Sequence, residues 1–283
     1  MLFQLIVAGL AIGAIYSLIA LGFVMLLRVM NLLNIAQGEM VMAGAFLGLL
    51  FYVALKLPFP VAFILALGLV FLLGFLVERL GIRPLKNPTL INMITATVAI
   101  SIILVNAGML LGGVRPLPFP SPIREAPVAL LGVRVAPLSL AIIGISLILM
   151  GALQVFFYLT RAGIAMRAVM DDKEAASLMG VKVVTVVALA FAISAALGAS
   201  AGLLVAPLIF VSFDMGLIAI KAFAGAVLGG LYSFPGAVLG GFLLGIIETL
   251  TAAYVSSGYK DVVPMALLII VLLIRPQGIF SRG

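Results

Sequence analysis

Long stretches without a charged residue dominate this sequence. Residues 1–27, 135–160 and 183–213 each exceed the about 20 apolar residues that a helix needs to cross a bilayer. Hydrophobic residues make up 65% of the 283-residue chain and charged residues only 9%, a balance foreign to soluble globular domains. A β-barrel would show short segments of alternating polarity instead. The sequence therefore predicts an all-α polytopic membrane protein, with residues 1–283 forming a single transmembrane domain.

The uncharged runs divide the chain into predicted membrane spans. Beyond the sixth run, residues 221–250 could form one long span or two short segments broken at residues 232–236, because proline and glycine interrupt helices. We favour the break, since it places Arg275 and Arg282 on the more basic side of the membrane. The total is about 8–9 transmembrane segments, including broken or re-entrant helices. The first six predicted spans are residues 1–27, 40–55, 61–77, 87–114, 137–160 and 183–206.

An internal echo accompanies the predicted break. Residues 43–50 (AGAFLGLL) match residues 224–231 (AGAVLGGL) at six of eight positions. In this topology the two segments run in opposite directions, as an inverted-topology repeat requires. In transporters of that kind, broken helices at matching positions indicate the substrate path. The alternative is a chance match, because Ala, Gly and Leu are common in membrane helices.

The basic residues predict the orientation of the chain. Arg79, Arg83 and Lys86 share one side with the basic residues of the 161–182 loop, and this set is larger and lies in shorter loops than the set opposite. By the positive-inside rule, that side is cytoplasmic. The opposite set is Lys56, Arg115, Arg124 and Arg134. The net charge of +7 is therefore interpreted as a topology signal and a source of contacts with anionic lipid rather than with nucleic acid.

Several kinds of chemistry are excluded. The chain has no His and no Cys, so thiol catalysis and the common His or Cys metal sites are ruled out. It also lacks the Gly-x-x-x-x-Gly-Lys-[Ser/Thr] phosphate loop of many ATPases. We expect no catalytic residue, metal or cofactor in this chain, which is not predicted to be an enzyme.

The loop at residues 161–182 is the longest polar insertion. It places five charged residues within eight positions and predicts a short surface helix that ends at Gly180. Arg167 and Asp171 are four residues apart, so their side chains can meet on that helix. Composition alone leaves two interpretations open, a solvated loop or a docking element for a soluble partner. The small or apolar residues near one helix face are Ala168, Ala175, Ala176 and Met179.

A local motif favours docking. The run Glu174-Ala175-Ala176-x-x-x-Gly180 resembles the EAA-x-x-x-G signature of the membrane subunits of ABC importers. That resemblance implies that the loop is the coupling helix, which inserts into a cleft of a separate ATPase subunit. The residues implicated in ATPase coupling are Gly163, Arg167, Asp171, Asp172, Glu174, Ala175, Ala176 and Gly180.

Further motifs extend the resemblance along the chain. Residues 13–18 (GAIYSL), 34–39 (NIAQGE), 221–230 and the ending Arg275-Pro276-x-Gly278 resemble permease subunits of branched-chain amino acid ABC importers, closest to the LivH type. Gln37 stands where that family usually has His. The resemblance implies a multi-pass permease in the inner membrane of a prokaryote, with ATP used by separate ATPase subunits. It also implies a periplasmic or extracellular substrate-binding protein and a second permease chain, usually a related LivM-type subunit.

The candidate substrate pathway follows from the polar residues within the apolar runs. Broken helices expose N–H groups at the starts of half-helices, where a carboxylate binds favourably. Alternative roles are open, namely a dipole partner for Glu39, interhelical hydrogen bonding in the fourth span, and close helix packing for the glycines. Glu248 is expected near a span end, at the interface. The pathway candidates are Gln37, Glu39, Asn92, Thr95, Ser101, Gly229 and Gly230.

Two other functions are weighed. Related permeases import urea, short amides or other small polar solutes, so the resemblance is less specific for the substrate than for the superfamily. A stand-alone secondary transporter is the runner-up of a different class. Such transporters use acidic residues buried in the bundle, whereas here the acidic residues are expected at the ends of apolar runs.

Overall fold

A computed structural model describes residues 2–85, 89–123, 126, 128–130, 133–275 and 278–279. Among these residues, seven helical segments are long and apolar enough to cross a membrane, and two shorter apolar helices accompany them. The prediction of an all-α polytopic membrane protein is confirmed. Lys86, Arg124, Pro276 and Arg282, which entered the sequence arguments, lie outside the described residues.

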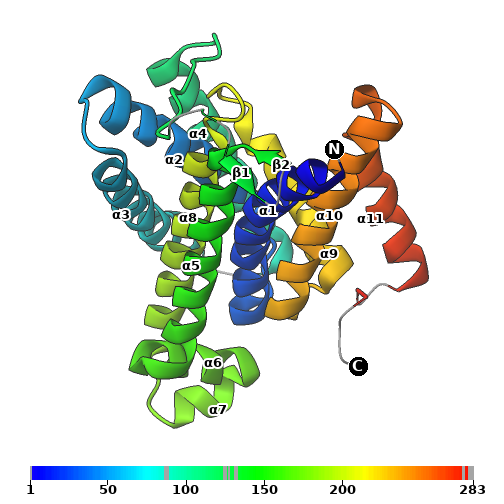
Figure 1. Ribbon diagram of the computed structural model, residues 1–283. Coiled ribbons are helices and arrows are strands. Elements are labelled where there is room, and N and C mark those ends of the chain that lie inside the picture. The colour runs from blue at the N-terminus through cyan, green and yellow to red at the C-terminus, as the bar shows by residue number, and fades with distance from the viewer. Residues whose placement is uncertain are drawn as a thin grey trace.

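Eleven α-helices are described in order along the chain (Figure 1). An antiparallel hairpin that the sequence did not predict, β1 (Val128–Leu130) and β2 (Val133–Val135), lies between the fourth and fifth predicted spans. Short 3-10 turns cover Met215–Leu217 and Ser257–Tyr259, and π-helical turns Leu49–Ala54 and Glu78–Ile82 extend α2 and α3. The helices are α1 (Leu2–Met30), α2 (Gln37–Gly48), α3 (Phe59–Val77), α4 (Leu90–Gly112), α5 (Pro137–Leu159), α6 (Arg161–Asp171), α7 (Lys173–Leu178), α8 (Val183–Val205), α9 (Ile218–Gly229), α10 (Phe234–Tyr254) and α11 (Val262–Ile274).

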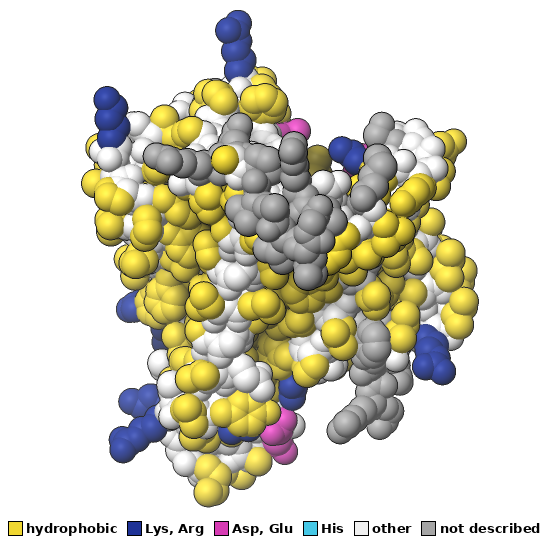
Figure 2. Space-filling model, in the orientation of Figure 1, with side chains coloured by type: hydrophobic (Ala, Val, Ile, Leu, Met, Phe, Trp, Pro, Cys, Tyr) yellow, Lys and Arg dark blue, Asp and Glu magenta, His cyan; other side chains and the backbone are white. Residues whose placement is uncertain are grey.

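Helix α1 is the centre of the bundle and packs against α5, α8, α9 and α10. Glycines allow the closest of these contacts: a Cβ atom added to Gly13 would come within 2.7 Å of the Cα of Phe242 on α10. Small residues of this kind let helix backbones approach each other in a membrane, where packing rather than water exclusion holds helices together. The outer helices α3, α4 and α5 expose most of their apolar surface, and the face in Figure 2 is mainly hydrophobic, with Lys and Arg mostly at its edges.

The two ends of the bundle are distinguished by the loops they carry. Arg28, near the end of α1, lies 3.4 Å from Asp171 of α6, so α6 and α7 lie at the end of the bundle where α1 finishes. The N-terminus is at the opposite end, and α11 returns the chain to the α6–α7 end (Figure 1). Arg275 directly follows α11 and therefore lies on the side predicted to be cytoplasmic.

The predicted interruption of residues 221–250 is confirmed. Helix α9 ends at Gly229, and α10 begins at Phe234 with Ser233 as its N-cap, whose hydroxyl accepts a hydrogen bond from the Gly236 N–H. Gly230 has a φ of +117°, a conformation that side-chain-bearing residues rarely adopt. Helix α9 has 12 residues, which is about 18 Å of rise, so it is too short to cross a bilayer by itself. The sequence argument had both short segments cross the membrane, and for the first of them this is wrong.

The internal echo coincides with a pair of half-helices. Helices α2 and α9 each have 12 residues and occupy matching positions of the echo. The end of α2 approaches Leu203 at the end of α8, whereas the end of α9 meets the start of α10, so the two half-helices run in opposite directions. Their starts meet inside the bundle, because a Cβ atom on Gly38 would lie 2.3 Å from the carbonyl oxygen of Gly216. This is the geometry that an inverted repeat requires.

The polar loop contains two helices rather than the one predicted. Asp172 separates α6 from α7, and its carboxylate accepts hydrogen bonds from the Glu174 and Ala175 N–H groups at 2.8 and 3.0 Å, so it caps α7. The expected Arg167–Asp171 contact is wrong for the described structure, since Asp171 pairs with Arg28 and Arg167 stacks on Tyr158. Gly180 has a φ of +85°, a left-handed conformation that ends the helical segment where the sequence predicted.

Candidate functional site

A cavity of about 430 Å³ lies where the two half-helices meet. Its walls come from α1, α4, the segment before α2 and the start of α9, and they are mainly apolar. Three polar side chains reach it, those of Glu39, Ser101 and Asp214. Apolar walls with a few convergent polar groups are typical of small-molecule sites. The main aromatic contributors are Phe23, Phe213 and Phe223.

Glu39 is the buried polar group of this cavity, with 8% of its surface exposed. Its Oε1 accepts a hydrogen bond from the Ser101 hydroxyl at 2.7 Å. Its Oε2 has no hydrogen-bond partner among the described residues, and within the same residues no Lys or Arg lies in ion-pair distance. Gly216 leaves room for this carboxylate, since a Cβ atom there would lie 2.4 Å from Oε2. The carboxylate in this cavity is therefore stabilised by a single hydrogen bond, which comes from a neutral hydroxyl.

Gln37 is close to this cavity but points into the bundle between α1 and α8, with none of its surface exposed. Its Nε2 donates to the Ser194 carbonyl at 3.0 Å, and the Ser194 hydroxyl lies 2.8 Å from its Oε1. The same hydroxyl lies 3.0 Å from the carbonyl oxygen of Gly22. Gln37 thus joins the start of α2 to α1 and α8, and the structure places it in a packing contact rather than on the cavity wall.

The three candidates on α4 separate. Ser101 reaches Glu39, whereas Asn92 and Thr95 lie on the exposed face, where the Thr95 hydroxyl donates to the carbonyl oxygen of Ile91. Thr97, which the sequence argument did not select, is buried and accepts a hydrogen bond from the Ile35 N–H at 3.3 Å. Thr97 and Ser101 are four residues apart and share a helix face, a spacing that could have singled them out.

Gly229 and Gly230 lie at the turn between α9 and α10 and do not line the cavity. A Cβ atom on Gly229 would lie 1.9 Å from the carbonyl oxygen of Gly236. Both glycines are therefore required by close backbone packing and by the positive φ of Gly230, which was the alternative role considered for them.

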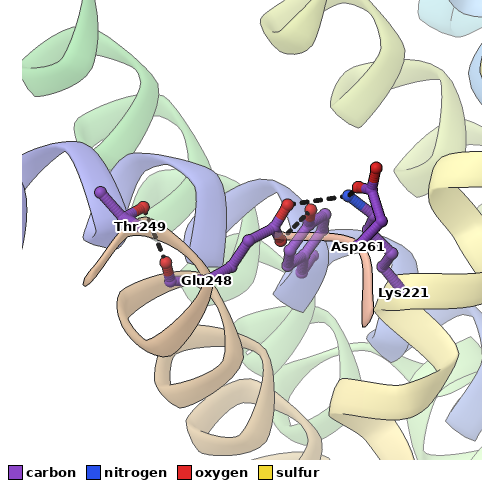
Figure 3. A network of polar contacts seen from close by, with 6 residues as sticks. Lys221, Glu248, Thr249 and Asp261 are labelled. Carbon is purple, nitrogen blue, oxygen red and sulfur yellow. Dashed lines mark hydrogen bonds and ion pairs between the residues drawn. The ribbon is translucent and has the colours of Figure 1, made fainter. Parts of the chain in front are cut away.

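Glu248 was expected near a span end, at the interface, and its side chain is buried inside the bundle near the end of α10. It lies on α10 with 6% of its surface exposed. The Tyr16 hydroxyl donates to its Oε2 at 2.6 Å, and the Lys221 ammonium donates to its Oε1 at 2.7 Å. Lys221 also donates to Asp261 at 2.5 Å, so one cluster joins α1, α9, α10 and the start of α11 (Figure 3). Sequence spacing gave no hint of it, because its members are 232, 27 and 40 residues apart along the chain.

The coupling candidates on α6 and α7 also differ in exposure. Glu174 and Ala175 are exposed with Asp171 and Asp172, but Ala176 is buried against the chain itself. Gly163 is buried too, since a Cβ atom there would lie 2.0 Å from the carbonyl oxygen of Phe156. The apolar side chains offered to the exterior are Leu178 and Met179, with 89% and 85% of their surface exposed. An outside partner would meet these two residues rather than Ala176.

Comparison with known proteins places the chain in a family. The family model described as "Branched-chain amino acid transport system / permease component" matches residues 5–272. The chain belongs to this family. It is 34% identical to the high-affinity branched-chain amino acid transport system permease protein LivH of Escherichia coli K12, over 97% of this chain and 94% of that protein. It is also 34% identical to the corresponding permease protein BraD of Pseudomonas aeruginosa, over 99% and 95% of the two chains.

More distant relatives agree. A probable branched-chain amino acid transport permease protein LivH of Methanocaldococcus jannaschii is 31% identical over 93% of this chain and 87% of that protein. Among solved structures, PsaBC from Streptococcus pneumoniae in complex with Fab contains a chain that superposes with a TM-score of 0.56 and 16% identity, over 97% and 91% of the two chains. This likeness shows the fold alone. The chain is therefore a multi-pass permease component, and its homologues are transport permeases rather than enzymes.

Proposed function

We propose that this chain is the membrane-spanning permease subunit of an ABC importer that carries branched-chain amino acids across the inner membrane of a prokaryote. The single observation that supports this most strongly is the family match over nearly the whole chain. The relatives' names describe high-affinity branched-chain amino acid transport. The chain itself uses no cofactor in this scheme, because separate ATPase subunits consume the ATP.

Three partners complete the importer. ATPase subunits dock on the α6–α7 end of the bundle, where Leu178 and Met179 are exposed beside charged residues. A substrate-binding protein delivers the amino acid to the opposite end. A second permease chain, related to this one and of LivM type, packs against it in the membrane, where α3 and α5 expose apolar surface.

The burial of Glu39 and Glu248 supports a second candidate. Acidic residues inside a bundle are what ion-coupled secondary transporters use, and the sequence argument against that class assumed that they lie at span ends. The two functions differ in their energy source. Uptake of labelled leucine into proteoliposomes that contain the chain with its co-purifying subunits should require ATP hydrolysis. Uptake that a proton or sodium gradient drives without ATP would overturn the proposal, as would transport of urea but not of leucine.

The docking of the ATPase is tested separately with Leu178→Ser. Loss of a buried leucine contact costs about 1.5–3 kcal/mol, which is a weakening of roughly 10- to 150-fold. The matched control is Leu111→Ser, because Leu111 is equally exposed, at 89%, but lies near the end of α4 at the other end of the bundle. Co-purification of the ATPase should be lost in the first variant only. Equal co-purification with both variants would show that α7 is not the docking element.

A further inference from the structure

The carboxylate of Glu39 lies at a cavity wall, and no Lys or Arg in the described part of the chain pairs with it. It is more than nine-tenths buried, one oxygen is unpartnered, and its one hydrogen bond comes from the neutral Ser101 hydroxyl. A buried charge is costly unless it is paired and hydrogen-bonded. Inside a membrane bundle such groups face an interior cavity and take part in function. Glu39 lines such a cavity, and no Lys or Arg of the described residues forms an ion pair with it.

The rest of the cavity indicates what kind of cation fits. The walls around Glu39 are apolar and aromatic, with Phe23 from α1, Phe213 before α9 and Phe223 within α9. Its volume of about 430 Å³ falls within the range of small-molecule sites. A metal ion would need several more oxygen ligands, and no group of three or more acidic residues suited to a metal occurs among the described residues. A ligand with one ammonium group and a branched apolar body satisfies both parts of the site.

We infer that Glu39 and Ser101 form the subsite that binds the α-ammonium group of an amino acid in transit, with the aliphatic side chain of that amino acid against Phe23, Phe213 and Phe223. This inference rests on the proposed function and assigns the recognition step to named residues. Ser101 is a positioning residue, because its hydroxyl donates to Oε1 and holds the carboxylate at the cavity wall. Gly216 makes room for Oε2 itself, because a side chain at this position would collide with the carboxylate.

A purely structural role for Glu39 makes a different prediction. Glu39 lies in the first turn of α2, where a carboxylate interacts favourably with the helix dipole. If that were its whole role, Glu39→Gln would change ligand binding little, by less than about fivefold. If the carboxylate binds an ammonium group, the same variant leaves that cation with an uncharged amide, and binding falls by about tenfold or more.

The experiment uses the absence of cysteine from the chain. Val105→Cys places a single thiol on the cavity wall, and Leu110→Cys on the same helix provides an exposed thiol outside it. In the assembled complex, the rate at which a small maleimide labels the thiol is measured with and without each of three probes: leucine, isopentylamine and 4-methylpentanoate. We expect leucine and isopentylamine to protect Cys at position 105, and 4-methylpentanoate, which lacks the ammonium group, not to protect it. None of the probes should protect Cys at position 110. If Cys at position 105 is not labelled, Ile220→Cys on the facing wall takes its place.

The variants then test the residues. Glu39→Gln in the Val105→Cys background should raise the leucine concentration for half protection by about tenfold or more, and Ser101→Ala should raise it less. The matched control is Glu78→Gln, because Glu78 is also buried with an unpartnered Oε2 but lies away from the cavity. Protection by 4-methylpentanoate equal to that by leucine would overturn the inference, as would unchanged protection in Glu39→Gln. If Glu39→Gln does not assemble, the comparison of the three probes on the unchanged site decides.

The protection experiment can fail while the proposed function stands, and the proposed function can fail while the protection experiment succeeds. Wild-type leucine uptake with ATP, together with unchanged protection in Glu39→Gln, would remove the subsite and leave the importer. Protection by isopentylamine in a complex that takes up no leucine would retain ammonium recognition and remove branched-chain amino acid import.

Discussion

Two carboxylates are buried to the same degree in one bundle and have opposite surroundings. Glu248 has 6% and Glu39 8% of its surface exposed. Glu248 receives a hydrogen bond from Tyr16 and an ion pair from Lys221, and every partner belongs to the chain itself. Glu39 receives a single hydrogen bond from Ser101.

The difference separates stability from function. Lys221 and Glu248 connect the half-helix α9 to α10, and through Tyr16 to α1, so this ion pair links the broken segment to the central helix of the bundle. Removing one partner of a buried pair leaves an uncompensated charge. At Glu39 that uncompensated state is already present, which costs stability without a benefit to the fold. We therefore expect loss of folding from changes around Glu248 and loss of transport from changes at Glu39.

Lys221→Met should have the largest effect on stability. It leaves Glu248 buried without its cation, and breaking a buried pair costs about 3–5 kcal/mol. The free energy of unfolding is measured by SDS titration in mixed micelles. Adding Glu248→Gln to Lys221→Met should recover part of the loss, because the orphaned charge is then gone. A loss below about 1 kcal/mol, the range of exposed pairs, would mean that the Lys221–Glu248 pair behaves as an exposed one.

Tyr16→Phe is the next test. It removes the 2.6 Å hydrogen bond to Glu248 and keeps the ring in the core, and hydrogen bonds to charged groups contribute about 1.5–3 kcal/mol. The same titration measures the change. Tyr52→Phe is the matched control, because it also removes a tyrosine hydroxyl but leaves the contacts of Glu248 and Lys221 unchanged. Equal stability of Tyr16→Phe and the wild type would show that Lys221 alone compensates Glu248.

Asp261→Asn should have a small effect, because the Asp261 side chain is 61% exposed and exposed ion pairs contribute about 0–1 kcal/mol. The hydrogen bond from Lys221 holds the pKa of the Asp261 carboxyl below its usual range. A lowered folded-state pKa stabilises the protein above the unfolded-state value, about 3.9, and this contribution is lost as the pH falls through the folded-state pKa. The stability difference between wild type and Asp261→Asn should therefore be present at pH 7 and vanish in acid. A difference that grows toward acid pH would contradict this sign.

The sequence predicted the spans and the break better than the site. Uncharged runs and the Ser-Phe-Pro-Gly segment locate the helices because bilayer thickness and proline act locally along the chain. Side-chain direction was harder to predict. Thr95 and Ser101 lie on one mainly apolar helix, so polarity alone did not tell the outer face from the inner one. Only the four-residue spacing of Thr97 and Ser101 indicated the inner face. The Lys221–Glu248 contact spans 27 residues and depends on how two broken segments fold back together.

The coupling segment shows the same division. Its position between two spans, and the glycine that ends it, followed from the sequence. The separation into α6 and α7 did not, although Asp172 before Lys173 and Glu174 is an N-cap pattern that could have indicated it. Ala175 and Ala176 are neighbours with opposite exposure, which only the packing of α7 against the bundle determines.

The most direct test of the account is ATP-driven leucine uptake by Glu39→Gln, measured per inserted complex beside Glu78→Gln. The two carboxylates share burial and an unpartnered oxygen, and only Glu39 faces the cavity. The account predicts that Glu39→Gln inserts, binds the ATPase and is at least as stable as the wild type, while its uptake at subsaturating leucine falls by about tenfold or more, and that Glu78→Gln retains uptake. Wild-type uptake by Glu39→Gln would contradict the central claim that this uncompensated carboxylate serves the substrate.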